Sequence, residues 1–360
     1  MRVPAVLLAC AVSAVLVSGC DKPTREPSAG SDTPGGAVEW KVAGTFPSSL
    51  PSLGGTGARM AGGLLALSGG RIKLQVFEPG ELVAPLEVFE AVSKGTVDAG
   101  LSSPASWSER MPAVAFFGAP PFGADAVETL AWLYEGRGLE LWREVYAAHN
   151  VVPVPCGYVP PEAFGWFRAP VAGNEPFKGL KMHLAGLGGQ VLQKLGAQVL
   201  VLSAEDVYPA LERGVLDAAQ VSVPSVDSKL GLARVAKHYY FPGWQQPTTI
   251  LELIVHKPRW DALGESDRTL IETVCRDTLV FGLARGEAQQ GLALSDLKKQ
   301  GVQVHYWSDE QLQRFRNAYD GVVKEMRIKD ETFKRVQDAY QNFRQTYSEW
   351  RQLSRLPRGF

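Results

Sequence analysis

Residue types that commonly do chemistry are present in this chain, but their spacing matches no catalytic motif. The sequence has no G-x-S-x-G nucleophile turn, no P-loop ending in Gly-Lys-Ser/Thr, and no Cys/His cluster with zinc spacing. The histidines are scattered, at His149, His183, His238, His256 and His305. Because no nucleophile can be paired with a base, the sequence argues against an enzyme, and we expect neither a cofactor nor a metal site. Binding is the chemistry that the sequence favours.

One polar turn is a candidate binding site. Residues 183–190 read HLAGLGGQ; the AGLGGQ part follows an expected strand, opens an expected helix and superficially resembles a dinucleotide-binding turn, but it lacks the full glycine spacing. The turn does supply a helix N-terminus, whose unpaired N–H groups form a partly positive site. His183 ends the preceding strand. Its imidazole could satisfy a backbone group or bond a ligand oxygen, and the sequence leaves both interpretations open.

The elements that would position such a site contain a repeated unit. Residues 94–99 read KGTVDA and residues 213–218 read RGVLDA, each after an amphipathic helical run and before a short strand-like stretch. The repeat predicts two similar α/β lobes, although helix–Gly–strand units are common in α/β proteins. Ligands of open α/β sheets bind beyond the carboxyl ends of strands, so we expect both copies to face one cleft. The residues that would face it are Ser102, Ser103, Gln220 and Ser222.

The rest of the mature chain alternates strands and helices and then becomes almost wholly helical. The opening strand–helix–strand pattern predicts a parallel sheet. The long strand TILELIVHK at 249–257 is a candidate hinge between the lobes. Ser308 and Gln311 form a capping-box pattern. A stripe at helical spacing, which we interpret as core packing, comprises Phe333, Val336, Tyr340, Phe343 and Tyr347. Other expected helices lie at 55–70, 85–95, 126–150, 188–197 and 205–214, and other strands at 38–46, 71–77, 96–103, 151–157, 164–171, 180–186, 198–203 and 215–223.

The N-terminal residues are expected to direct export. Residues 1–20 read MRVPAVLLACAVSAVLVSGC, with an apolar run too short to span a bilayer and small residues before a cysteine. The run LVSGC resembles the lipobox of bacterial lipoproteins, which implies lipid on Cys20 and a periplasmic location. Asp21 resembles a signal for inner-membrane retention. An ordinary secretory signal is the alternative. The polar residues 20–37 read as a flexible tether.

The composition excludes some partners and bears on the cysteines. The 360 residues are 45% hydrophobic with a net charge of −1, and no basic run contains interleaved aromatics, so we expect no nucleic-acid partner. Export implies an oxidising compartment. Cys156 and Cys275 remain in the mature chain beside Cys20. Their spacing gives no support for pairing, and two separate buried thiols are favoured over a disulfide.

Several long segments resemble one known family. Residues 67–100 (LSGGRIKLQVFEPGELVAPLEVFEAVSKGTVDAG), residues 177–220 (FKGLKMHLAGLGGQVLQKLGAQVLVLSAEDVYPALERGVLDAAQ) and residues 239–263 (YYFPGWQQPTTILELIVHKPRWDAL) are similar to solute-binding proteins of TRAP transporters, the tripartite ATP-independent periplasmic systems. The resemblance runs from about residue 40 to about residue 345. YYFPGW and SKLGL are most similar to the branch that binds 2-oxo acids.

The resemblance implies an α/β fold with two lobes joined by a hinge and by chain crossovers, and a long C-terminal helix spanning both lobes. Ligand binding would close the cleft by a hinge motion. The expected divisions are a signal peptide at 1–19, the tether at 20–37, lobe I at 38–160 with part of 250–300, lobe II at 161–249 with part of the C-terminal helices, and a helical region at 301–360.

The chain departs from the family pattern at the ligand site. His183 stands where the family's GLKMR carries an arginine that grips the ligand carboxylate, and histidine cannot make that planar fork. Gln220 and Val221 replace a Glu-Trp pair that helps hold a cation. Glu162 replaces a glutamine that is another cation ligand. Ala105 and Ser106 replace two tyrosines. Retention of a bound cation is left open.

We therefore expect a membrane-tethered periplasmic binding lipoprotein of TRAP type whose cleft takes a neutral or amphipathic ligand, a lipid among them. The alternative is a small carboxylate such as a 2-oxo acid, held by Lys181 or Arg59; an enzyme on this fold and a sensor or scaffold are further alternatives. Partners would be TRAP membrane subunits or another inner-membrane transporter. The predicted ligand-binding residues, besides the four of the repeat, are Trp107, Glu162, Phe164, Trp166, His183, Trp244 and Gln245.

Overall fold

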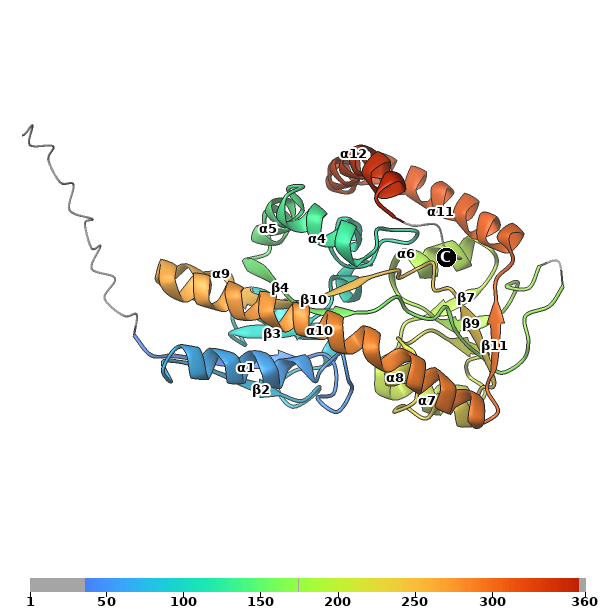
Figure 1. The fold of residues 1–360 in the computed structure, drawn as a ribbon, viewed down its shortest axis with the longest axis horizontal. Helices are drawn as coiled ribbons and strands as arrows, with labels where there is room; N and C mark the ends of the chain where they lie inside the picture. Colours follow the sequence, from blue (N-terminus) through green and yellow to red (C-terminus); the bar gives the residue numbers. More distant parts are fainter. Residues whose placement is uncertain (1–35, 174, 356–360) are drawn as a thin grey trace, which may run out of the picture. The chain divides into compact units, whose positions relative to one another are not determined.

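A computed structural model describes residues 36–173 and 175–355 and contains two β-sheets with helices packed against them (Figure 1). Lobe I is the part around the five-stranded sheet, in the order β2-β1-β3-β10-β4, and lobe II the part around the six-stranded sheet, in the order β11-β9-β5-β8-β6-β7. The predicted two-lobed α/β class is confirmed. The expected signal peptide, Cys20 and the tether up to residue 35 lie outside the described residues. No helix in the described ranges has the length and apolar character needed to cross a membrane.

Lobe I opens with the predicted strand–helix–strand unit. β1 pairs in parallel with β2, and Trp40 lies opposite Leu74. β10 lies between β3 and β4 and is antiparallel to both, so a late segment of the chain completes this sheet. Its strands are β1 (Val38–Gly44), β2 (Ile72–Phe77), β3 (Ala99–Ser102), β4 (Val151–Val159) and β10 (Thr249–His256). The helices of this part of the chain are α1 (Thr56–Leu67), α2 (Val88–Ser93), α3 (Ala115–Gly118), α4 (Ala126–Tyr134), α5 (Gly138–Ala147) and α9 (Lys257–Asp261).

Lobe II combines parallel and antiparallel pairs. β6 is parallel to β7 and β8, whereas β5 is antiparallel to β8 and β9. The strand β11, in a region expected to be helical, adds to the edge beside β9; this expectation was wrong because a four-residue edge strand leaves little pattern. The strands are β5 (Gly165–Phe167), β6 (Lys181–His183), β7 (Gln198–Leu200), β8 (Ala218–Ala219), β9 (His238–Phe241) and β11 (Gln303–Tyr306). The helices are α6 (Gly186–Lys194), α7 (Ala204–Glu212) and α8 (Pro224–Asp227).

The repeated sequence unit forms the same local structure in both lobes. α2 and α7 each end before a glycine in the left-handed region, Gly95 at φ 71° and Gly214 at φ 72°. The aspartate three residues later has the same role in each copy. Asp98 accepts from the N–H of Lys41 at 2.9 Å, and Asp217 accepts from the N–H of Lys181 at 3.0 Å. Each copy therefore holds a neighbouring parallel strand through its aspartate, β1 in the first copy and β6 in the second.

One long helix connects the two lobes. α10 (Glu265–Lys299) contributes Ile271 and Val274 to the core of lobe I, and Leu297 near its other end to the core of lobe II. Figure 1 shows it running past both sheets. After β11 the chain forms α11 (Asp309–Lys329), with the Ser308 cap as predicted, and α12 (Glu331–Leu353). Of the predicted core stripe in α12, Phe333, Val336 and Tyr340 are buried, whereas Phe343 and Tyr347 are half-buried.

Cys156 of β4 and Cys275 of α10 form a disulfide, with their Cα atoms 4.2 Å apart. The expectation of two separate thiols was therefore wrong. Both residues were correctly expected to be buried, and both lie in the core of lobe I. Sequence spacing could not reveal the pairing because it depends on α10 packing across β4, at a sequence separation of 119.

Candidate functional site

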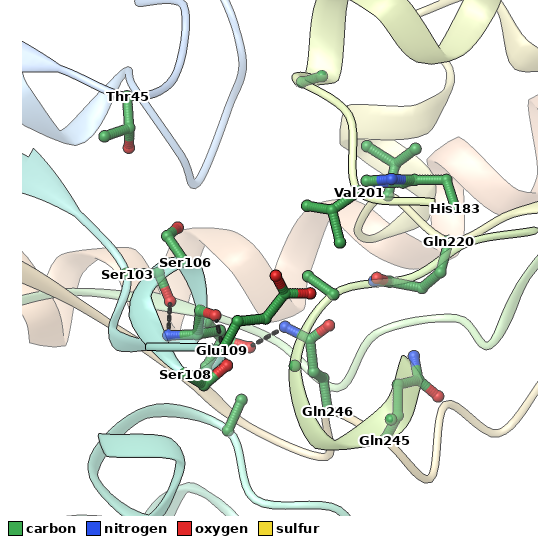
Figure 2. A pocket seen from close by; sticks show the side chains of 18 of the residues that line it. Thr45, Ser103, Ser106, Ser108, Glu109, His183, Val201, Gln220, Gln245 and Gln246 are labelled. Atoms are coloured by element: carbon green, nitrogen blue, oxygen red, sulfur yellow. Dashed lines mark hydrogen bonds between the residues drawn. The ribbon is translucent and has the colours of Figure 1, made fainter. Parts of the chain in front are cut away.

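A cavity of about 220 Å³ lies between lobe I and lobe II. Lobe I lines it with residues that follow β1 and β3, among them Thr45 and Ser103 (Figure 2). Lobe II contributes His183 at the end of β6 and Gln220 after β8. The cavity thus lies at strand ends of both sheets, where ligands of open α/β sheets bind. Five of the predicted site residues line it, namely Ser103, Glu162, His183, Gln220 and Gln245.

Glu162 is a buried carboxylate at the point where the chain first crosses between the lobes. Its oxygens accept hydrogen bonds from the Gln220 amide, from Thr249 Oγ1 at 3.2 Å and from the Gln246 amide at 3.4 Å. No lysine, arginine or histidine of the described chain forms an ion pair with it. Burial, and then the charge of Asp227, raise the pKa of Glu162 well above its ordinary value. Gln246 and Thr249 lie where the chain crosses back, so Glu162 connects the two crossover segments.

His183 is held by backbone groups of the neighbouring strand. Its Nδ1 lies 3.1 Å from both the carbonyl oxygen of Leu200 and the N–H nitrogen of Leu202. The two contacts need opposite tautomers: a protonated Nδ1 donates to Leu200, whereas an unprotonated Nδ1 accepts from Leu202 and leaves the ring proton on Nε2. Burial lowers the pKa of His183 to about 4, so the imidazole is neutral at physiological pH. Both alternatives from the sequence are thus compatible with the structure, since one ring nitrogen has backbone partners and the residue also lines the cavity.

The first turn of α6 also lines the cavity, through Ala185, Gly186, Leu187 and Gly188. Ala185 is the N-cap residue, in an extended conformation (φ −85°, ψ 164°), and its side chain cannot cap the helix. The N–H groups of Gly186, Leu187 and Gly188 have no acceptor in the described part of the chain outside their own helix. Gly186 has φ 68°, which favours glycine at this turn.

The other six predicted residues do not line the cavity. Ser102 and the Trp107 indole donate to Glu252 at 2.8 Å each, and the Trp166 indole donates to Asp227 at 2.8 Å. Ser222 is also buried, and it is not among the residues that line the cavity. Phe164 and Trp244 pack on Phe315, with ring centroids 5.4 and 4.7 Å away. These aromatic side chains are buried among other side chains, and Trp244 also stacks on Phe122 at 5.2 Å. The prediction failed because a core position and a pocket position look alike in the local sequence.

The two cations proposed to hold a carboxylate lie outside the cavity lining. Arg59 forms a surface ion pair with Asp277 at 2.8 Å, and Lys181 is exposed at the start of β6. Arg110 is the one lysine or arginine among the residues that line the cavity, and it is exposed, as is its neighbour Glu109. Within the described residues, the cavity lining therefore contains no buried lysine or arginine.

Sequence reasoning missed several polar residues of this region. Gln246 and Thr249 follow Gln245 in the crossover segment, and a pair of glutamines before a buried strand was the available signal. Glu252 was missed although it is the only charged residue inside the apolar strand β10. Burial raises the pKa of Glu252 to about 7 and that of Asp227 to about 6, while hydrogen-bond donors lower both. A lone acid in an apolar strand predicts such a buried carboxylate.

Comparisons with known proteins agree with this architecture. Residues 43–330 match the bacterial extracellular solute-binding proteins of family 7. A monocarboxylate 2-oxoacid-binding periplasmic protein of Nostoc sp. strain PCC 7120 is 34% identical over 319 residues, 89% of this chain and 87% of the relative. A TRAP transporter solute-binding protein of Bordetella bronchiseptica RB50, solved with calcium and picolinate, is 30% identical with a TM-score of 0.86, covering 88% of this chain and 95% of that one. A TRAP periplasmic solute-binding protein of Colwellia psychrerythraea, solved with calcium and pyruvate, is 28% identical with a TM-score of 0.84, covering 88% and 97%.

Proposed function

Because this chain belongs to the family 7 bacterial extracellular solute-binding proteins of TRAP type, we propose that it binds a small organic monocarboxylate of the 2-oxo acid class in the cleft between its lobes. It is a periplasmic transport component and not an enzyme. Relatives with about a third of their residues identical are described as binding 2-oxo acids or a ring carboxylate, which supports this ligand class. We propose that the ligand passes to TRAP membrane subunits.

The size of the cavity supports a small ligand. Pockets that bury drug-sized molecules measure about 300–1,000 Å³, and this cavity of about 220 Å³ lies below that range. A lipid chain would need a longer apolar space. The aromatic side chains expected to line such a space are instead buried in the hydrophobic core clusters. The neutral or lipid ligand expected from the sequence is therefore replaced by its alternative, the small carboxylate.

The residues around Glu162 fit a hard cation bound with the ligand. Glu162 is buried without a basic partner in the described ranges, and Gln245 Oε1 in the same cavity lining has no hydrogen-bond donor there. Carboxylate, amide and hydroxyl oxygens of Glu162, Gln220, Gln246 and Thr249 are the ligand types that Ca²⁺ and Na⁺ take. No group of three or more His, Cys, Asp or Glu side chains suited to a metal occurs in the described chain, so amide oxygens would be needed. A cation there supplies positive charge for ligand oxygens and favours ionised Glu162.

Calorimetry of the ligand-free protein with pyruvate and 2-oxobutyrate tests this function. We expect micromolar or tighter binding, and a loss of about tenfold or more when EDTA and a sodium-free buffer remove cations. Glu162→Ala should weaken binding by about tenfold or more, because a charge-assisted contact to the cation is lost. Arg59→Gln and Lys181→Gln are matched controls that should bind as the wild type does.

Two outcomes of this experiment would contradict the proposal. Recovery of a lipid from the purified protein, with no heat on adding either acid, would restore the lipid interpretation. Weaker binding by Arg59→Gln or Lys181→Gln would assign the carboxylate to that cation.

We further propose that residues 38–160 and 161–249 move as separate lobes about the crossover segments. Solution scattering of the same samples should then show a smaller radius of gyration with ligand.

Membrane tethering is also proposed, on the lipobox-like run LVSGC and the polar residues after it. Lipid on Cys20 would hold the protein at the inner membrane, close to the transporter that receives the ligand. A Cys20→Ser variant expressed in the source cells should appear in the soluble periplasmic fraction or stay unprocessed. Membrane fractionation that finds the variant still attached would reject the anchor and leave the ligand proposal intact.

A further inference from the structure

A carboxylate ligand needs a counter-group, and the first turn of α6 offers unpaired N–H donors. α6 has nine residues, and the N–H groups of Gly186, Leu187 and Gly188 have no acceptor in the described ranges outside their own helix. Its first turn contains no acidic residue, so nothing there competes for the positive end of the helix dipole. Gly186 and Gly188 both line the cavity, and glycine lets neighbouring residues pack close to this turn, since a Cβ would lie 2.8 Å from Ser108 Oγ at position 186 and 2.9 Å from Cβ of Gln245 at position 188. Helix N-termini of this kind bind anions.

His183 is an independent second donor at the same place. His183 is only 9% exposed and lines the cavity. Figure 2 shows its ring near Val201, on the same side of the cavity as Gln220. Nδ1 already has backbone partners, whereas Nε2 has no protein partner in the described structure. In the tautomer in which Leu202 donates to Nδ1, the ring proton lies on Nε2, and Nε2–H can donate to a ligand oxygen.

Among the described residues, no lysine or arginine that lines the cavity is as buried as the N–H donors of α6 and His183. Arg110 is exposed on the lobe I side, where water screens its charge. Arg59 is paired with Asp277 on the surface. The N–H donors of α6 and His183, in contrast, are buried, and a hydrogen bond to an anion is stronger where water is excluded.

We propose that the ligand carboxylate is bound by neutral donors, the N–H groups at the start of α6 together with His183 Nε2–H, rather than by an arginine or lysine. This inference rests on the proposed function. This set of N–H donors has no formal charge of its own, so it suits a single carboxylate. It also makes Ala185 a position that controls affinity, because a side-chain oxygen there would occupy the same N–H groups.

Ala185→Asp is the decisive variant. An aspartate at an N-cap in this conformation accepts from the first-turn N–H groups and places a negative charge where the carboxylate binds. We expect the affinity for pyruvate to fall by about 100-fold or more, since opposed like charges cost several kcal/mol, while the melting temperature is unchanged or higher. Ala185→Asn, which competes without charge, should lose about fivefold. Gly264→Asp at the N-cap of α10 (φ −68°, ψ 160°), with open space around its Cβ, is the matched control and should bind normally.

Variants of the side chains complete the test. His183→Leu should lose about tenfold or more, the value of one hydrogen bond to a charged group, and His183→Gln, which keeps an N–H donor, should retain most of the affinity. Arg110→Gln should change affinity by less than about threefold. In ¹⁵N NMR of the complex, the His183 ring should be the neutral Nε2–H tautomer from pH 6 to pH 8.

The outcomes separate this inference from the function on which it rests. If the wild type binds neither 2-oxo acid, both fail. In a second case the wild type binds pyruvate while Ala185→Asp binds it equally well, or while Arg110→Gln loses about tenfold in affinity. Either result overturns only the binding of the carboxylate by neutral donors. An imidazolium signal for His183 in the complex would also reject it.

Discussion

Reduction of the Cys156–Cys275 disulfide is expected to lower the free energy of unfolding by about 2–5 kcal/mol. The bond closes a long loop, with a sequence separation of 119 that includes all of lobe II up to β9. Cross-linking such a loop removes many conformations from the unfolded chain, and both cysteines are buried in the core of lobe I. Urea unfolding with and without a phosphine reductant, followed by tryptophan fluorescence, measures the difference.

The Cys156→Ser/Cys275→Ser double variant provides the control. It should unfold at the midpoint of the reduced wild type and should not respond to the reductant. Thiol labelling of the denatured protein verifies that the wild type is oxidised before treatment. An unchanged midpoint for fully reduced wild type would contradict a stabilising role for the bond.

Removal of the Glu252 carboxylate should destabilise the protein by a similar amount. Glu252 is fully buried, and its Oε1 accepts from Ser102 and Trp107 at 2.8 Å and from Tyr146 at 3.2 Å. In Glu252→Ala these donors lose their acceptor inside the lobe I core, so we expect a loss of about 3–5 kcal/mol in the free energy of unfolding. Glu252→Gln, which keeps an acceptor oxygen of the same shape, is the matched control and should lose much less at pH 8.

The same pair of variants tests a dependence on pH. The pKa of Glu252 is raised to about 7 in the folded protein, so between about pH 4 and pH 7 the folded state binds a proton that the unfolded chain has released. The free energy of unfolding of the wild type should therefore fall as pH rises through this window, with about 3 kcal/mol due to Glu252. Asp227, with a pKa of about 6, acts in the same direction, and His183, with a pKa of about 4, acts oppositely. If Glu252→Gln shows the same slope as the wild type, Glu252 does not titrate in this range.

The sequence predicts those parts of the fold that depend on local patterns. Alternation in β1 and β2 and the helical period of α1 identified the opening unit, and the stop signals Gly95 and Gly214 marked the ends of α2 and α7. The long expected helix at 126–150 is instead two helices, because Arg137 adopts the left-handed region at φ 67°. Which strands become neighbours, and hence the disulfide, depends on contacts between distant segments that no local pattern encodes.

The sequence predicted those residues of the candidate site that are polar and lie at the ends of expected strands. His183 and Gln220 follow this rule, and both line the cavity. The prediction was wrong for the tryptophans because an indole is as common in a protein core as in a pocket. The N–H groups of Trp107 and Trp166 donate to the buried carboxylates of Glu252 and Asp227 and not to the cavity. Which face an aromatic side chain takes depends on buried acids elsewhere in the chain, so only the folded structure decides it.

The position of β10 sets the order in which a growing chain can fold. β10 separates β3 from β4 in the lobe I sheet, yet it is made after the whole of β5 to β9. β4 therefore has no strand partner when it first emerges, and lobe II must wait for β11, made after α10, to complete its own sheet edge. Neither lobe can finish during synthesis of its own segment. Completion of both sheets therefore requires segments made late, which favours folding after synthesis over folding during it.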